Sequence, residues 1–162
     1  MTILFLSFIY LNPLNAKEYS GGFANIDQGD DLLRPAIFGL VRFDNDVYFH
    51  TYLFGREIGN VREQTIVATG GKFFNILSNG AIQGSWGVSL MQEDIKLIGE
   101  SQTHSERFHY NMGFRIGMRA LISKKPITYL AWESHLYPAG SATLFLVTGR
   151  QQLLSFGVGW TI

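Results

Sequence analysis

The stretch FHYNMGFRIGMRALI, residues 108–122, decides the fold. Every second residue from Phe108 to Ile122 is apolar, and the residues between them are polar or small as far as Arg119. Only Leu121 departs from this alternation. Successive side chains of a β-strand point to opposite faces, whereas the period of a helix, about 3.6 residues, would mix the two sets. The stretch therefore predicts a long β-strand with one apolar and one polar face.

Two other segments repeat this pattern. In the first, Ile82, Trp86, Val88 and Leu90 alternate with Gln83, Ser85, Gly87 and Ser89. At the C-terminus, Leu154, Phe156, Val158, Trp160 and Ile162 alternate with Ser155, Gly157, Gly159 and Thr161. Residues 36–43 and 47–56 are apolar on both faces, and Lys72 stands among the apolar positions of residues 65–77. The pattern indicates a chain built from a series of strands.

Turn-forming residues divide the chain at regular intervals. Short runs rich in Asp, Asn, Gly, Ser and Pro lie at residues 44–46, 78–80 and 123–126. Longer connections are expected between them, at residues 27–35, 57–62, 93–107 and 138–151. Such alternation of short turns and long loops is typical of outer-membrane barrels. We predict an all-β fold, a single antiparallel up-and-down transmembrane β-barrel, with strands at residues 19–26, 36–43, 47–57, 63–77, 80–92, 107–122, 127–137 and 151–162.

The composition of the polar face indicates which face is outside. A soluble lipocalin-like barrel, the alternative, would present a surface rich in Lys and Glu to water. Here the polar positions are largely Gly, Ser, Thr, Asn and Gln, and charged residues make up only 16% of the chain, below the soluble average of about 25%. Small residues suit the narrow interior of an eight-stranded barrel. We therefore expect the apolar face to contact lipid, with these membrane-facing residues: Trp86, Phe114, Trp132, Phe156 and Trp160.

The sequence argues against several function classes. The 13 Lys and Arg residues balance the 13 Asp and Glu residues, so no overall field attracts nucleic acid. The chain has no cysteine, which excludes thiolate metal sites and thiol nucleophiles. It also lacks the HExxH motif, the phosphate-binding loop and the dinucleotide-binding glycine pattern. We expect neither a metal nor a cofactor. Beyond the N-terminus, no apolar run reaches the roughly 18 residues that a membrane helix needs.

The N-terminus resembles an export signal. An apolar run over residues 3–11 is followed by a break at residues 12–13 and by the small residue Ala16. We expect residues 1–16 to be a signal peptide cleaved near Ala16, and residues 17–162 to form the barrel. The expected location is the outer membrane of a Gram-negative bacterium.

The C-terminus resembles an assembly signal. Its last strand ends in alternating apolar residues from Phe156 to Ile162. This pattern is similar to the terminal strand by which outer-membrane proteins are recognised by the barrel-assembly machinery. The partners expected for the chain are therefore this machinery, outer-membrane lipid and lipopolysaccharide.

Polar residues on two neighbouring strands are expected to meet inside the barrel. Glu133 and His135 share one face of the seventh strand, and Trp132 and Ser134 share the other. Since Trp132 is the better candidate for lipid contact, Glu133 and His135 should point inward. The sixth strand presents His109, Asn111, Arg115 and Arg119 to the same interior. A buried charge must be paired, so these residues predict a polar network that fills the lumen.

A catalytic interpretation of the same strand stays open. His135, oriented by Glu133, is a candidate general base near the outer rim. Ser134 lies next to both residues in the sequence, but alternation sends it to the opposite face. The three residues therefore do not form a local triad.

The segment HLYPAG, residues 135–140, resembles a motif of the outer-membrane lipid A 3-O-deacylase family. That family is an eight-stranded barrel with His-x-Ser-Asn-Ala/Gly at this position and a glutamate further on. The resemblance implies that His135 is the catalytic histidine. Tyr137 stands at the position of the serine and Pro138 at that of the asparagine. The resemblance then implies either a member without that serine chemistry, or a nucleophile from elsewhere, such as Ser134 after a bulge or Ser141 in the last loop.

Three functions follow from these observations. The leading interpretation is a barrel with a structural or surface-interaction role, a filled polar lumen and no open pore. The alternative is a lipid A acyl-ester hydrolase that uses His135. A pore is the weakest interpretation, because side chains fill the interior of an eight-stranded barrel.

Overall fold

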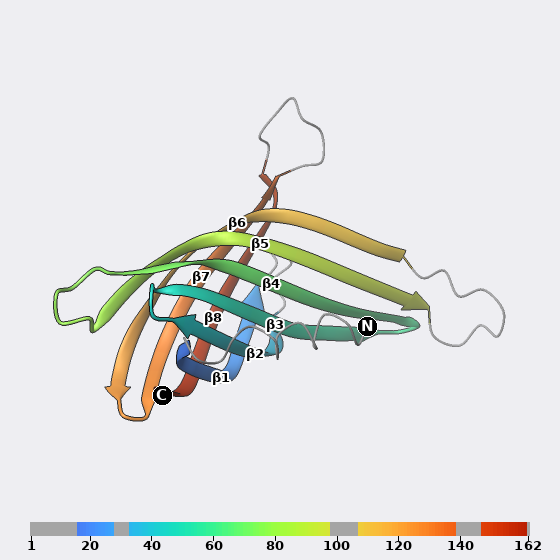
Figure 1. The fold of residues 1–162 in the computed structure, drawn as a ribbon. Coiled ribbons are helices and arrows are strands. Elements are labelled where there is room, and N and C mark those ends of the chain that lie inside the picture. Colours follow the sequence, from blue (N-terminus) through green and yellow to red (C-terminus); the bar gives the residue numbers. More distant parts are fainter. Residues whose placement is uncertain (1–15, 28–32, 98–106, 139–146, 162) are drawn as a thin grey trace.

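A computed structural model describes residues 16–27, 33–97, 107–138 and 147–161. This part of the chain forms eight strands (Figure 1). Their bounds are β1 Ala16–Asp27, β2 Leu33–Phe43, β3 Val47–Ile58, β4 Val61–Asn75, β5 Ile82–Leu97, β6 Arg107–Lys124, β7 Ile127–Pro138 and β8 Val147–Thr161. Among the described residues, no helix is long and apolar enough to cross a membrane.

Each strand pairs antiparallel with the next along the chain, and β1 pairs with β8. The register of the closing pair sets Phe23 opposite Phe156. The predicted eight-stranded antiparallel up-and-down barrel is thus confirmed. The connections at residues 44–46, 76–81 and 125–126 lie at the end of the barrel where β1 begins and β8 finishes.

Apolar side chains cover the outer surface of the barrel. Along β5 and β6, the exposed large side chains fall on alternate residues, and Trp86 and Phe114 are 57% and 61% exposed. On β8, Leu154, Phe156 and Trp160 are also exposed. Trp132 of β7 completes the five side chains expected to face lipid, all of which the structure places on the outside.

The interior is more aromatic than the sequence alone indicates. Large rings are buried there beside small and polar residues, namely Phe38, Tyr48, Tyr52, Phe54, Phe73, Tyr129 and Tyr137. This explains why residues 36–43 and 47–56 are apolar on both faces: β2 and β3 present one apolar face to the outside of the barrel and another to the lumen. Glycines on neighbouring strands leave space for the rings, since a Cβ on Gly157 would lie 2.3 Å from the Tyr129 ring.

One connection differs from the prediction. Residues 57–62, expected to form a long loop, are the paired ends of β3 and β4 joined by a tight turn at Gly59 and Asn60. Gly59 has φ of 55°, a left-handed conformation that glycine adopts without steric cost. Similarly, β5 continues to Leu97 where the prediction ends at residue 92. Residues 144–147 form an apolar run within the expected last loop, and only its final residue, Val147, lies in the described part of the chain, as the first residue of β8.

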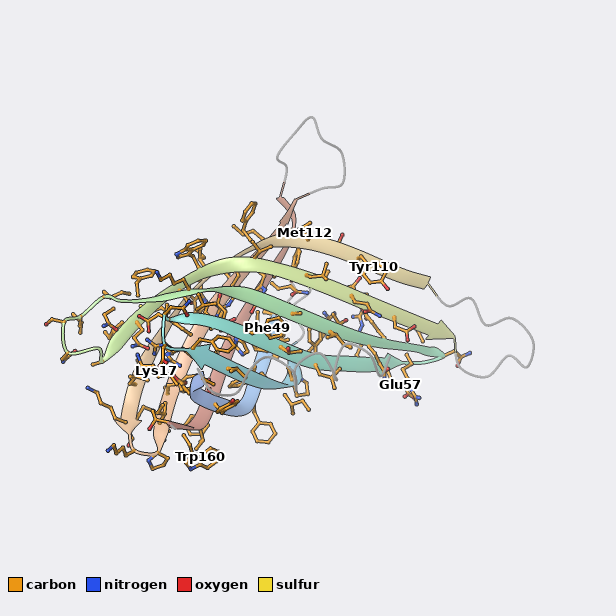
Figure 2. All side chains as sticks on the ribbon, in the orientation of Figure 1. Lys17, Phe49, Glu57, Tyr110, Met112 and Trp160 are labelled. Carbon is orange, nitrogen blue, oxygen red and sulfur yellow. The ribbon has the colours of Figure 1, made fainter. Side chains whose placement is uncertain are left out.

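The barrel wall is not of equal height. The pairing of β4 with β5 continues to Val61 and Leu97. On one side of this region, the pairing of β6 with β7 stops at Phe114 and Leu136, and on the other the pairing of β2 with β3 stops at Phe54. Strands β3 to β6 therefore project beyond the rest of the wall (Figure 1). Figure 2 shows the exposed side chains of Tyr110 and Met112 along this part of β6, and Glu57 near the end of β3.

We expect Gly157→Ala to destabilise the barrel by about 1–3 kcal/mol, because the new methyl group would overlap the buried Tyr129 ring. The matched control is Gly39→Ala, since a Cβ on Gly39 meets nothing within 4 Å. Urea unfolding of protein refolded in phospholipid vesicles measures both changes. Equal effects of the two substitutions would contradict the tight contact between Gly157 and Tyr129.

Candidate functional site

The centre of the lumen holds an ion pair between β6 and β7. Arg115 Nε donates to Glu133 Oε2 at 2.7 Å, and Arg115 Nη2 donates to the other carboxylate oxygen. Both side chains are only 2% exposed. This is the paired-fork geometry in which guanidinium and carboxylate bind most strongly. The two charges thus satisfy each other in a region that water does not reach.

Arg115 also contacts β3 across the lumen and the neighbouring strand β5. Its Nη1 donates to the hydroxyl of Tyr48 on β3, and lies 3.2 Å from Ser85 Oγ on β5. The guanidinium carbon stands 4.7 Å from the centre of the Tyr48 ring, a cation–π geometry. The Tyr48 hydroxyl in turn lies 3.3 Å from the carbonyl oxygen of Trp86. One arginine therefore connects β3, β5, β6 and β7.

Two buried histidines flank Glu133. Nε2 of His135 lies 3.2 Å from Glu133 Oε2, within hydrogen-bond distance, and Nδ1 of His50 lies 3.5 Å from Oε1. His50 packs against the rings of Tyr52 and Phe38, with ring centres 4.1 and 5.0 Å away. Both histidines are 1% exposed or less. The carboxylate of Glu133 therefore binds Arg115 and lies within hydrogen-bond distance of His135, while Nδ1 of His50 lies close to it without a hydrogen bond.

A second ion pair lies one layer nearer the end of the barrel with the described short turns. Arg119 of β6 donates to both carboxylate oxygens of Glu18 on β1, at 2.7 and 2.8 Å. Its Nε donates to Gln83 Oε1 at 2.8 Å, and that oxygen also accepts from Arg42 Nη1 at 3.2 Å. The Arg119 guanidinium stands 4.3 Å from the centre of the Phe73 ring. The second layer thus links β1, β2, β5 and β6.

The turn between β2 and β3 extends this second layer. Asp46, in a left-handed conformation with φ of 64°, accepts from Arg42 Nη2 at 2.6 Å and from Lys17 Nζ at 3.5 Å. Partial burial opposes ionisation of Asp46, but the hydrogen bond and charge of Arg42, helped by Lys17, outweigh it and lower the pKa of the carboxyl group. The stabilisation from this contact is present above the ordinary Asp pKa and is lost as the pH falls through the lowered value.

The structure brings together some of the sequence-predicted lumen residues. Arg115, Arg119 and Glu133 lie in the two buried layers. Asn111 does not join them, because it is exposed on the projecting part of β6. The side chain of His109 lies outside the described residues. Sequence reasoning placed Gln83 on the polar face of its strand but did not include it in the network. It missed four other members, namely Glu18, Arg42, Tyr48 and His50.

Of the predicted catalytic residues, the structure describes Glu133, Ser134 and His135, and all three are buried. His135 is fully buried inside the barrel, and both oxygens of Glu133 contact Arg115. Ser134 belongs to the opposite face of β7, where it is buried. Ser141, the other nucleophile suggested by the deacylase resemblance, lies outside the described residues. Among the described residues no cluster of three or more His, Asp or Glu side chains is arranged to bind a metal ion.

Comparison with known proteins finds a similarity of fold alone. No protein-family model matches the sequence, and no curated protein sequence matches it. Solved structures do match. The outer membrane protein OprG of Pseudomonas aeruginosa is 11% identical with a TM-score of 0.59, over 91% of this chain and 98% of OprG.

Two further structures are similar to this chain. Ail, the attachment invasion locus protein of Yersinia pestis, is 12% identical with a TM-score of 0.55, over 91% of this chain and 99% of Ail. The Neisserial surface protein A, NspA, is 13% identical with a TM-score of 0.54, over 91% and 96% of the two chains. At such low identities these likenesses show a shared fold, the small eight-stranded barrel.

We expect Glu133→Gln to destabilise the barrel by about 3 kcal/mol or more, because it leaves the buried charge of Arg115 without its counter-ion. The matched control is Glu57→Gln, which removes an exposed carboxylate 3.0 Å from Arg62 and should cost no more than about 1 kcal/mol. The measurement is the free energy of unfolding in urea for vesicle-refolded protein. A loss at Glu133 as small as the loss at Glu57 would show that the central pair does not hold the barrel together.

Proposed function

We propose that this chain is an outer-membrane β-barrel with a structural or surface-interaction role and a lumen closed by its own side chains. The observation that carries the proposal is the division of the wall, with apolar side chains outside and ion pairs inside. Both halves of this arrangement suit a barrel surrounded by lipid.

The outer surface is too apolar for a barrel in water. Soluble monomers rarely expose connected apolar patches of more than a few hundred Å². Here exposed large apolar residues recur on all eight strands, for example Phe23 on β1, Ile37 on β2 and Leu130 on β7. The soluble lipocalin-like arrangement would place such residues inside. Lipid acyl chains are the natural cover for this surface.

The closed interior supports a role other than transport. Rings and paired charges from all parts of the wall occupy the lumen, and the two arginine layers span it from β6 to β3 and to β1. The fully buried position of His135 equally favours packing over catalysis on a lipid substrate. Activity of this barrel therefore belongs to its outer surface and its ends.

The orientation in the membrane follows from the connections. Outer-membrane barrels place short turns in the periplasm and longer connections outside the cell. The turns at residues 44–46 and 125–126 would then face the periplasm. The projecting ends of β3 to β6 would lie on the opposite side of the membrane, at the cell surface. Lipopolysaccharide and other molecules at the cell surface are the proposed partners of that end. The names of NspA and Ail, a surface protein and an attachment protein, accord with this role.

Delivery to the outer membrane is part of the proposal. We infer that a signal peptide is cleaved near Ala16, which is also the first residue of β1. The barrel-assembly machinery would then recognise β8 through its outward apolar residues, which include Phe156 and Trp160.

Insertion into lipid tests the location. We expect Leu154→Arg to weaken the folded state in vesicles by about 2–4 kcal/mol, because Leu154 is 60% exposed on the outer face of β8 and a charge there meets acyl chains. Asn60→Arg, in the exposed β3–β4 turn, should change it by less than about 0.5 kcal/mol. Heat-modifiable mobility on a cold detergent gel reports the folded fraction. Equal tolerance of the two arginines would exclude a lipid-facing wall.

Electrical recording tests the closed lumen. We expect no stable conducting state when the wild-type protein is inserted into planar bilayers, because ion pairs and aromatic rings occupy the interior. A steady open channel, under conditions where the cold gel shows a folded barrel, would rule out the closed lumen.

A further inference from the structure

Lys72 stands out on the outer face of the barrel. Phe73 is buried in the lumen, so its neighbours on β4, Lys72 and Phe74, point outward, and both are exposed. Lys72 pairs with Val47 of β3 on one side and with Trp86 of β5 on the other. It is therefore a charged residue in the middle of an apolar surface.

Most of the exposed side chains around Lys72 are apolar, although Asp44 and Asn45 of the β2–β3 turn are exposed next to its partner Val47. Val47, Phe74 and Trp86 are 38%, 51% and 57% exposed, and the turn that follows β4 exposes Ile76 and Leu77. Within the described part of the chain, no carboxylate forms an ion pair with Lys72. By contrast, the exposed Lys17 contacts Asp46, and Lys124 Nζ donates to the carbonyl oxygen of Asn79.

A lipid-facing lysine without a partner is costly in the hydrocarbon region. The flexible stem of lysine allows its ammonium to reach toward the head groups, a movement known as snorkelling. Lys72 is three residues before Asn75, where β4 ends beside the turn-bearing end of the barrel. The near membrane surface for its ammonium is therefore the one at the short turns.

We propose that Lys72 and Trp86 form a binding site for the phosphate group of a phospholipid in the leaflet next to the short turns. This inference rests on the proposed membrane location. The ammonium supplies a positive charge with three hydrogen-bond donors, and the Trp86 indole supplies one N–H donor. The two residues are direct cross-strand partners, and such pairs hold their Cβ atoms about 5 Å apart, a spacing at which both donors reach one phosphate.

The acyl chains of this lipid would lie along the outer face of β5, beyond Trp86. Tryptophan prefers the membrane interface, where its ring lies among acyl chains and its N–H meets polar head groups. Val88 and Leu90, at the next outward positions of β5, are 46% and 47% exposed. They continue the apolar surface away from the phosphate toward the bilayer centre.

Two bilayers without net charge, one whose lipid contains phosphate and one whose lipid does not, separate the effect of the phosphate from other effects of the lipid. Full-length protein is refolded into phosphatidylcholine vesicles, which carry phosphate, and into digalactosyl diacylglycerol vesicles, which do not. We expect Lys72→Met to raise the equilibrium constant for unfolding roughly tenfold in phosphatidylcholine, through loss of a charged hydrogen bond. In the galactolipid it should leave the constant unchanged or lower it, because the lysine there has no phosphate to bind.

Conservative variants and a surface control complete the test. Lys72→Arg should retain the phosphatidylcholine effect, and Trp86→Phe should lose part of it. Lys125→Met, in the β6–β7 turn, should behave alike in both lipids. The same response of Lys72→Met in both vesicles, or a matching response of Lys125→Met, would overturn the proposed site. Failure of the wild type to show a folded, heat-modifiable band in either vesicle would instead refute the membrane location.

Discussion

The inner face of a closed eight-stranded tube must accommodate its own charges, and the rest of this structure depends on how two arginines do so. Arg115 and Arg119 are four residues apart on β6 and both point inward, yet each finds a different carboxylate. Glu133 comes from the neighbouring strand, whereas Glu18 comes from β1 at the closure of the barrel. Because neither charge can be left unpaired at low dielectric, the two ion pairs fix the position of β6 relative to its neighbour β7 and to β1 across the lumen.

The filled interior depends on aromatic rings as well as on ion pairs. The same two layers that satisfy the arginines use tyrosine and phenylalanine rings as their walls, with Arg119 above Phe73 and Arg115 above Tyr48. These rings are possible only because neighbouring strands carry glycine where a side chain would collide, as at Gly71 beside the Tyr48 hydroxyl. The buried rings of the lumen and the glycines of the wall therefore depend on each other for close packing.

Sequence reasoning succeeded where the two faces of a strand differ chemically. Residues 108–122 predicted a strand, an orientation and two inward arginines, because each face carries its own residue types. It was less informative for β3, where Tyr48 and Tyr52 face the lumen while Leu53 faces outward, since apolarity alone does not separate the two environments. The pairing of Arg119 with Glu18 could not be predicted, because 101 residues separate them and only barrel closure brings them together.

Because the described wall is taller along β3 to β6 than elsewhere, the two sides of the barrel differ. Among the described residues, the wall is tall along β3 to β6, whereas the described parts of β1, β2, β7 and β8 end lower. The two borders of the tall sheet also differ. Arg56 and Glu63 form an ion pair beside the β3 border, while Tyr110 and Met112 expose apolar side chains along the β6 border. A neighbour that reaches this barrel from the side can therefore distinguish one flank from the other by charge and by shape.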